Sequence, residues 1–257
     1  MLTFNLADSN KSVNRQPSTV NQMKLCRCLF LFFLILSSCN QTTDPYSGWK
    51  VVNGNPAGNK FSSLSQVDTS NVSTLKVAWT YHTKDVDTAA HSQIQCNPII
   101  INGTLYATSP QLKLFALDAA TGKEKWHYNP FDSISGEKKG VNFNLNSNRG
   151  VAFWTDGKED ERLFYTAGPM LRAIDAKTGK IIEGFGNKGK VDLREGLGME
   201  DKDLFVTATS ASTVYKDLLL VGTRVSEGMD AAPGHIRAYN VRTGKQEWIF
   251  HTIPYPG

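Results

Sequence analysis

The stretch "ALDAATGKEKW", residues 116–126, has the composition of a strand end, a tight turn and the start of a second strand. The same pattern returns as "AIDAKTGKIIE" at residues 173–183 and as "AYNVRTGKQEW" at residues 238–248. The three copies start 57 and 65 residues apart. Such spacing is typical of a structural unit that is repeated along a chain.

Each copy carries the residues that a tight turn needs. The third position holds Asp118, Asp175 or Asn240, whose side chains can accept backbone N–H groups within the turn. The seventh position is always glycine, which adopts a positive φ without the steric strain that a side chain would cause. These glycines are Gly122, Gly179 and Gly244.

The eleventh position is expected to join one repeat to the next. Trp126 and Trp248 carry a large apolar surface that can dock between neighbouring sheets. The middle copy has Glu183 at this position, so we expect its docking to differ, with Phe185 supplying the apolar contact.

The remainder of the chain predicts short β-strands. It has no long helical period, and its β-branched and aromatic runs are separated by turn residues. The pair Asn102-Gly103 between two apolar runs predicts a β-hairpin. We therefore predict an all-β fold in which the repeats form the blades of a propeller.

The N-terminal region predicts export. In "MKLCRCLFLFFLILSSC", residues 23–39, Lys24 and Arg27 flank an apolar run at 29–36 that is too short to span a bilayer. The ending "LSSC" resembles the lipobox of bacterial lipoproteins, which implies lipidation of Cys39.

Charge and cysteine content exclude several classes of partner and site. The formal charge is +4, and 24 basic and 23 acidic groups remain when residues 1–39 are set aside. This balanced distribution predicts no nucleic-acid partner. Cys96 is the one cysteine after residue 39, so neither a disulfide nor a cysteine metal site is expected there. The five histidines show no metal-ligand spacing, and we expect most of them at solvated positions.

The pattern Ala-x-Asp-x-x-Thr-Gly-x-x-x-Trp resembles the tryptophan-docking motif of the eight-bladed quinoprotein propellers, the dehydrogenases that use pyrroloquinoline quinone (PQQ). The stretches "QCNPIIINGTLYATSP", "NRGVAFW" and "VGTRVSEGMDAAPGHIRAYN" resemble successive blades of the same family. The membrane-associated branch that oxidises glucose, quinate and shikimate looks most similar.

The resemblance implies a domain organisation. Residues 1–39 are interpreted as a leader with a lipoprotein-type signal peptide whose true start is Met23, and residues 40–48 as a polar tether. Residues 49–257 resemble roughly the first half of the eight-bladed propeller. An open half-propeller exposes sheet edges, so we expect a chain that is truncated at its C-terminus and inactive alone.

PQQ is a planar anionic orthoquinone, which calls for cationic and hydrogen-bonding groups around it and for a calcium ion as Lewis acid. By resemblance, Glu227 is the calcium ligand and Arg149 lies beside the quinone oxygens. From the residues alone, a lone loop glutamate or turn arginine is more often solvated, and the flanking matches favour the ligand interpretation. The other cofactor-contacting positions implied by the resemblance are Gln95, Thr209, Arg224 and Ser226.

Some positions depart from the family pattern. The alcohol-oxidising branch has two adjacent cysteines where this chain has Phe143-Asn144, and some sugar-oxidising members have a histidine where it has Leu145. These differences argue against a methanol-type enzyme and leave the substrate open. The catalytic aspartate and the remaining metal ligands of the family are expected beyond Gly257.

Three functional hypotheses follow. In the first, the chain is part of an exported, lipid-anchored enzyme at the periplasmic face of a bacterial membrane. Hydride passes from a sugar, polyol or related alcohol to PQQ with calcium assistance, and electrons leave to a membrane quinone or cytochrome. In the second, a non-catalytic propeller lipoprotein acts as an assembly scaffold, which has no need of Arg149 or Glu227. In the third, a truncated product does not fold alone. The presence of both residues favours the enzyme.

Overall fold

The computed structural model describes residues 44, 46–89, 91–131, 147–197 and 204–254. The leader prediction and Cys39 lie outside these residues. Apart from one 3₁₀ turn, Val72–Thr74, the regular structure of the described residues is β-strand, which confirms the all-β prediction. The strands form three four-stranded antiparallel sheets and one two-stranded sheet.

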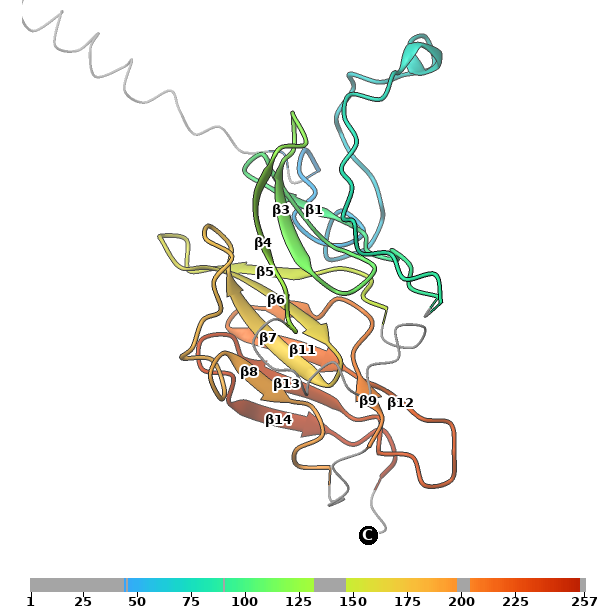
Figure 1. Ribbon diagram of the computed structural model, residues 1–257. Helices are drawn as coiled ribbons and strands as arrows, with labels where there is room; N and C mark the ends of the chain where they lie inside the picture. The colour runs from blue at the N-terminus through green and yellow to red at the C-terminus, as the bar shows by residue number, and fades with distance from the viewer. Residues whose placement is uncertain (1–43, 45, 90, 132–146, 198–203, 255–257) are drawn as a thin grey trace, which may run out of the picture. The chain divides into compact units, whose positions relative to one another are not determined.

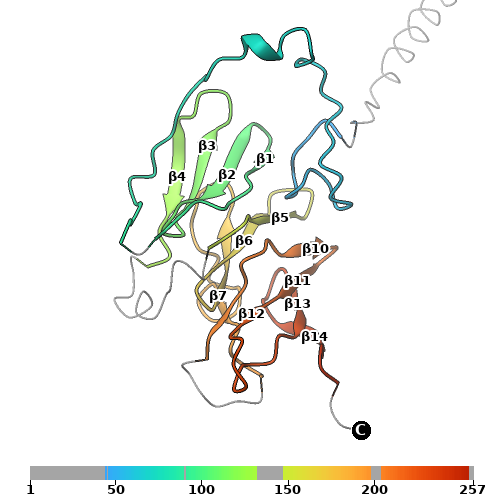
Figure 2. The same cartoon turned by 90° about the vertical axis from the view of Figure 1, so that its right-hand side faces the viewer.

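The first sheet follows chain order, so each strand pairs with its sequence neighbour (Figures 1 and 2). The predicted hairpin is present, with φ values of 48° at Asn102 and 73° at Gly103. Its strands are β1 (Ile99–Ile101), β2 (Thr104–Thr108), β3 (Leu114–Asp118) and β4 (Glu124–Tyr128).

The other two large sheets repeat this meander, which is the arrangement of propeller blades. The second contains β5 (Ala152–Thr155), β6 (Glu161–Ala167), β7 (Met170–Asp175) and β8 (Lys190–Asp192). The third contains β10 (Thr213–Tyr215), β11 (Leu218–Gly222), β13 (Ile236–Asn240) and β14 (Gln246–Phe250). The two-stranded sheet pairs β9 (Val206–Thr207) with β12 (Arg224–Val225).

The repeated turn has the chemistry that its sequence predicts. In the first copy, Asp118 Oδ1 accepts the Thr121 N–H at 2.9 Å, and the Asp118 carbonyl accepts the Gly122 N–H at 2.8 Å. Gly122 has a φ of 71°, in the region that glycine tolerates. The other two copies repeat these bonds, with φ values of 72° at Gly179 and Gly244.

A tryptophan from one sheet sits on the turn of the next. The Trp126 indole lies against Gly179, where an added Cβ would be only 2.6 Å from Cδ2 of the indole ring. The Trp126 Nε1–H donates to the Ala176 carbonyl at 3.1 Å. Glycine is therefore required at this position for two reasons: its backbone has a positive φ, and the indole occupies the space that a side chain would need.

A further tryptophan, Trp79, lies upstream of the three repeats and makes the same contact. The Trp79 indole lies against Gly122, and its Nε1–H donates to the Ala119 carbonyl at 3.2 Å. Aligned on Trp79, residues 69–79 read "TSNVSTLKVAW": Asn71, Thr74 and Lys76 keep the motif, but Leu75 stands where the other three copies have glycine, so the sequence pattern is incomplete there.

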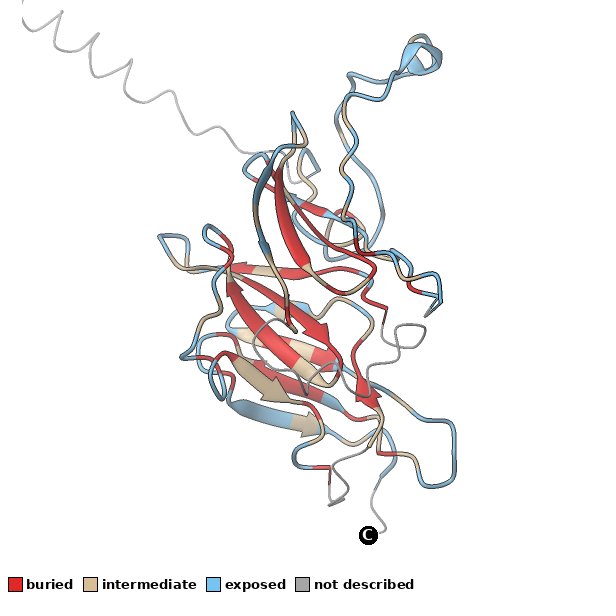
Figure 3. Ribbon diagram, in the orientation of Figure 1, coloured by how far each residue is buried: buried red, intermediate tan, exposed pale blue. Residues whose placement is uncertain are grey.

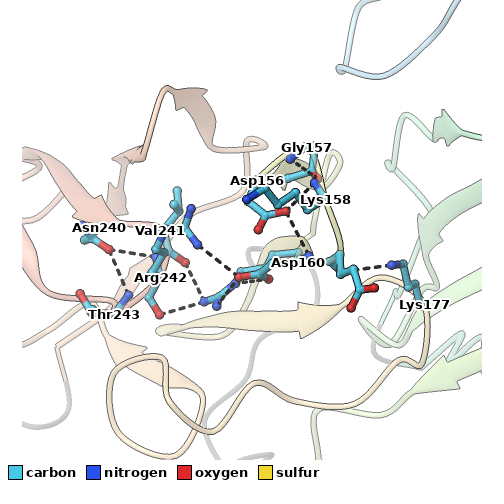
Figure 4. Close-up of polar contacts among 12 residues, drawn as sticks. Asp156, Gly157, Lys158, Asp160, Lys177, Asn240, Val241, Arg242 and Thr243 are labelled. Atoms are coloured by element: carbon cyan, nitrogen blue, oxygen red, sulfur yellow. Dashed lines mark hydrogen bonds and ion pairs between the residues drawn. The ribbon is translucent and has the colours of Figure 1, made fainter.

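The second and third sheets use an arginine, Arg162, in place of tryptophan; Figure 4 labels its partners Asp160, Val241 and Arg242. Val241 has the same place in the third copy as Ala176 in the second, and its carbonyl accepts Arg162 Nη1–H at 3.1 Å. The same nitrogen donates to the Arg242 carbonyl at 2.8 Å. The Asp160 carboxylate accepts two hydrogen bonds of 2.8 Å from Arg162 Nε–H and Nη2–H and so holds the guanidinium in orientation. Arginine thus replaces the indole as the donor to this carbonyl.

Backbone contact completes the junction that lacks tryptophan. The Gly186 N–H donates to the Thr243 carbonyl at 2.8 Å, and a Cβ on Gly244 would lie 2.6 Å from Gly186 N. Phe185 is fully buried, with its ring 5.5 Å from that of Phe164. The prediction that this junction differs is confirmed, and Phe185 belongs to the apolar core that the second and third sheets share.

Burial follows the junctions between sheets. Strands β3, β6 and β7 are mostly buried, whereas β14 is mostly exposed (Figure 3). Trp248 on β14 is 40% exposed and Phe250 is 59% exposed. Within the described ranges the Trp248 indole N–H has no acceptor, so the predicted docking of Trp248 is not observed there.

Substituting alanine at Gly179 tests the docking contact. We expect Gly179→Ala to lower the free energy of unfolding by about 2–4 kcal/mol, because the methyl group meets the Trp126 indole at a positive φ. The matched control is Gly157→Ala, where φ is 77° but nothing lies within 4 Å of the added Cβ, and the cost is about 1 kcal/mol. Equal losses in urea denaturation would contradict the docking role.

Removing the arginine tests its role as a tryptophan substitute. We expect Arg162→Met to lower the free energy of unfolding by about 2–4 kcal/mol, because the carbonyls of Val241 and Arg242 and the Asp160 carboxylate lose a charged donor. Arg242→Met is the control, because its ion pair with Asp160 is longer, at 3.6 Å, and more exposed. Its cost is about 1 kcal/mol or less. A smaller loss of stability for Arg162→Met than for the control would argue against the role of Arg162 in place of a docking tryptophan.

Candidate functional site

Three of the predicted cofactor residues lie on chain segments that lead into successive sheets. Gln95 precedes β1, Arg149 precedes β5 and Thr209 precedes β10. The Asn97 N–H donates to the Arg149 carbonyl at 3.0 Å, and the Arg149 N–H donates to the Thr209 carbonyl at 2.8 Å. These backbone hydrogen bonds bring together residues that are more than fifty positions apart in the sequence.

The side chains at this junction are partly fixed. Ser147 Oγ–H donates to Gln95 Oε1 at 3.0 Å, and Arg149 Nε lies 3.5 Å from the same oxygen. Arg149 is exposed, and its two terminal amino groups make no hydrogen bond within the described part of the chain. The guanidinium can therefore offer both amino groups to an anionic ligand.

Two neighbours that the sequence analysis did not single out hold Arg149 in place. Asn148 is buried; its Oδ1 accepts the Gly150 N–H at 2.9 Å, and its amide donates to the Thr166 carbonyl at 3.3 Å. A Cβ on Gly150 would lie 2.5 Å from Val52 Cγ2, so only glycine fits there. The "NRG" stretch thus fixes the backbone on both sides of one exposed arginine. The Asn and Gly beside Arg149 were the sequence features that could have predicted this support.

A cavity of about 350 Å³ opens beside Arg149. Its walls come from the segment around residues 50–58 and from the segments that begin the second and third sheets. This size lies within the range of small-molecule sites. The polar lining residues beside the arginine include Lys50, Asn53, Asn97, Ser210 and Ser212.

The other predicted residues lie on β12 and the loop that follows it. Arg224 pairs across the two-stranded sheet with Thr207, which is two residues before Thr209. Ser226 and Glu227 follow β12 directly, and both are exposed. The β9–β12 pairing therefore links this second group of residues to the first through the backbone.

The donor set suits PQQ better than it suits a complete calcium site. Arg149 and Arg224 supply two cations, while Gln95, Thr209 and Ser226 supply an amide and two hydroxyls, as a planar polyanion requires. For a metal, the described residues contain no group of three acidic, histidine or cysteine side chains. Glu227 is thus the one predicted carboxylate ligand, and calcium needs further oxygens.

Cys96 has no place in the chemistry, although it lies beside Gln95 in the sequence. Burial raises the pKa of the Cys96 thiol, which disfavours the reactive thiolate. Its sulfur accepts the Thr108 N–H at 3.3 Å.

Among the described residues, no helix is long and apolar enough to cross a membrane.

The expectation that most histidines are solvated agrees with the exposed positions of His82, His91 and His127. His235, which directly precedes β13, is the exception and is only 3% exposed. No sequence signal marks this burial, since the residue follows Pro233-Gly234, a dipeptide that is typical of solvated turns.

Comparison with known proteins agrees with the fold and the motifs. Quinoprotein glucose dehydrogenase of Gluconobacter oxydans is 34% identical over 80% of this chain and 27% of its own length. Quinate/shikimate dehydrogenase (quinone) of Acinetobacter baylyi is 31% identical over 79% of this chain and 27% of its own length. The chain thus spans about a quarter of the length of these relatives.

Solved structures and family models give the same answer. Quinohemoprotein alcohol dehydrogenase from Comamonas testosteroni has a TM-score of 0.63 and 27% identity over 83% of this chain and 28% of its own. The model of the PQQ family, described as the β-propeller domain of glucose, ethanol and alcohol dehydrogenases, matches residues 49–257. With its repeated docking turn and blade-like sheets, the chain belongs to the PQQ β-propeller family.

Proposed function

We propose that the chain is the N-terminal part of an exported PQQ-dependent dehydrogenase that oxidises a sugar, a polyol or a related alcohol. The observation that carries this proposal is the support built around one exposed arginine. Backbone hydrogen bonds join the Gln95, Arg149 and Thr209 segments, and the Arg149 guanidinium lies at a cavity with unused donors. A scaffold protein has no use for such an arrangement.

The chain's own residues would bind and orient the cofactor. When bound, PQQ would supply a two-electron acceptor for hydride from the substrate carbon. Arg149 and Arg224 would neutralise its anionic groups, and Arg149 would stabilise the negative charge that grows on reduction. Thr209 and Ser226 would donate hydroxyl hydrogen bonds, and Gln95 would help to orient the arginine that it already contacts.

Glu227 would provide one carboxylate ligand to a calcium ion beside the cofactor. The support is its place on the loop after β12, next to Ser226, together with the family resemblance of "VSEG". A solved relative, a europium-containing methanol dehydrogenase with a TM-score of 0.59 and 28% identity, carries a metal according to its own name. Carboxylate oxygens suit either kind of hard cation.

Export, lipidation of Cys39 and a site at the periplasmic face of a membrane are part of the same proposal. They rest on the basic and apolar pattern of residues 23–39. A membrane quinone or a cytochrome would take the electrons, an idea supported by the word "quinone" in the name of the quinate/shikimate relative.

Loss of the exposed arginine tests the cofactor site. In the full-length protein with calcium, we expect Arg149→Gln to raise the Kd for PQQ by about 10-fold or more, because charge-assisted hydrogen bonds are lost. Titration followed by protein fluorescence measures the affinity. The control Arg194→Gln removes a charge that is paired with Asp192 and should leave the affinity unchanged. Absence of PQQ binding by the unaltered protein would instead favour the non-catalytic scaffold.

The metal role of Glu227 has a separate test. We expect Glu227→Gln to raise the calcium concentration needed for half-maximal PQQ binding by about 10-fold, because an amide oxygen is a weaker calcium ligand than a carboxylate. The protein without cofactor should keep its thermal stability, since the side chain is exposed. The matched control is Glu247→Gln, on exposed strand β14. An unchanged calcium requirement would remove Glu227 from the metal site.

A further inference from the structure

Two imidazole rings meet at the end of the third sheet. His235 Nε2 and His251 Nδ1 are 3.1 Å apart, and the rings lie edge to face with their centroids 4.4 Å apart. The last pair of the β13–β14 ladder is Ile236 with Phe250, so the histidines are the next residues outward on the two strands. Their side chains thus continue the ladder by one hydrogen bond after the backbone pairing ends.

This hydrogen bond lies at the base of the loop 226–234. The loop leaves β12 and returns to the sheet at His235. A Cβ on Gly234 would lie 3.8 Å from Val225 Cγ2 and 3.9 Å from the Thr223 carbonyl, so the two ends of the loop touch. Thr252 Oγ1–H adds a hydrogen bond of 3.3 Å to the Gly234 carbonyl. The returning end is therefore fixed by the two residues that follow β14.

The loop itself has little internal support. It contains one backbone hydrogen bond between described residues, from the Ala231 N–H to the Gly228 carbonyl at 3.1 Å. Met229 is fully exposed, while Ala232 is buried against the core. A loop of this kind takes its position from its two ends, because few of its own contacts restrain it.

The surroundings favour a neutral imidazole at His235. Burial lowers the pKa of His235, and the positive charges of His251 and Arg237 lower it further. Arg237 is itself buried and donates to the carbonyls of Leu193 and Glu195. A second proton on His235 would put an N–H at its buried Nδ1, which has no acceptor among the described residues, and would place a cation near Arg237.

The tautomer follows from the buried nitrogen on the other side of the ring. His235 Nδ1 is buried and has no partner within the described residues. An unpaired lone pair costs less there than an unpaired N–H, so we place the proton on His235 Nε2, which donates to His251 Nδ1. The side-chain amide oxygen of asparagine can take the place of the accepting nitrogen.

We propose that the hydrogen-bonded pair His235 and His251 is a positioning element for the loop 226–234, and that it releases this loop when the buried His235 imidazole takes up a proton. The pair would hold Ser226 and Glu227 where the cofactor and the cation need them, so this inference rests on the proposed function. It adds an acid-sensitive contact to the site, at residues that touch neither ligand.

The pH dependence has a definite sign. A lowered pKa in the folded protein means that the stabilisation is fully present above the unfolded value of 6.5. It is lost as the pH falls below that value, because the unfolded or open form takes up the proton first. We therefore expect the loop to open on acidification and to close again at neutral pH.

Hydrogen exchange in the full-length protein without cofactor tests the positioning role directly. At pH about 7.5, His251→Ala should raise the exchange of the 226–234 amides by about 5-fold or more, the effect of one lost hydrogen bond. His251→Asn should keep the wild-type protection at pH about 7.5, since its amide oxygen accepts the same hydrogen bond from His235 Nε2–H. The unaltered protein should lose protection at the lower pH after correction for the intrinsic rate.

The control is His82→Gln, at an exposed position on another segment, which should behave like the unaltered protein. Exchange that is insensitive both to pH and to His251→Ala would overturn the inference, whatever happens to PQQ. If His251→Ala does not fold, the unaltered protein and His251→Asn still decide the question.

A second readout separates this inference from the proposed function. With PQQ and calcium present, His251→Ala should raise the Kd for PQQ by about 5-fold at neutral pH, and His251→Asn should restore it. If the exchange pattern is as expected but the unaltered protein does not bind PQQ, the proposed function fails, and the positioning role of the His235–His251 pair stands. If PQQ binding is normal but amide exchange in residues 226–234 does not respond to pH or to His251→Ala, the positioning role of the pair fails, and the proposed function stands.

Discussion

One contact joins the sheets of this protein: a side-chain N–H of one sheet donates to a turn carbonyl of the next. Between the first and second sheets the donor is the Trp126 indole, and Trp79, which lies outside the strands, makes the same contact with the turn of the first sheet; each ring lies where a glycine has no side chain. Between the second and third sheets the donor is the Arg162 guanidinium, held by Asp160, and glycine backbones take the place of the ring contact. The carbonyl is a partly buried acceptor in each case, and leaving it unpaired would cost free energy in addition to the lost hydrogen bond.

The candidate site depends on these junctions. The backbone bonds from Asn97 to Arg149 and from Arg149 to Thr209 form only if neighbouring sheets are held at one fixed spacing. The docking turns lie at the opposite end of each sheet's meander, so they set the spacing without entering the site. Structural repetition and ligand binding are thus separated along each repeat, which lets the turn sequence stay constant while the segments between turns differ.

The loop that carries Ser226 and Glu227 has a different source of order. It has few contacts of its own and is positioned by β12 at one end and by the His235–His251 pair at the other. A cation bound at Glu227 would favour the same loop position that the histidine pair favours. Metal binding and the histidine contact would then support each other, and both would weaken when protons compete.

The sequence by itself determined the all-β class, the three docking turns, the need for glycine in each turn and the unusual middle junction, because these follow from local backbone chemistry. It also pointed to Arg149, Thr209 and Gln95, but only through motifs that resemble a known family. Only the tertiary structure decided that these three segments are joined by hydrogen bonds, that Arg162 replaces a tryptophan and that His235 is buried. Each of these depends on contacts between residues that are distant in the chain, and no local pattern records which donor reaches which carbonyl.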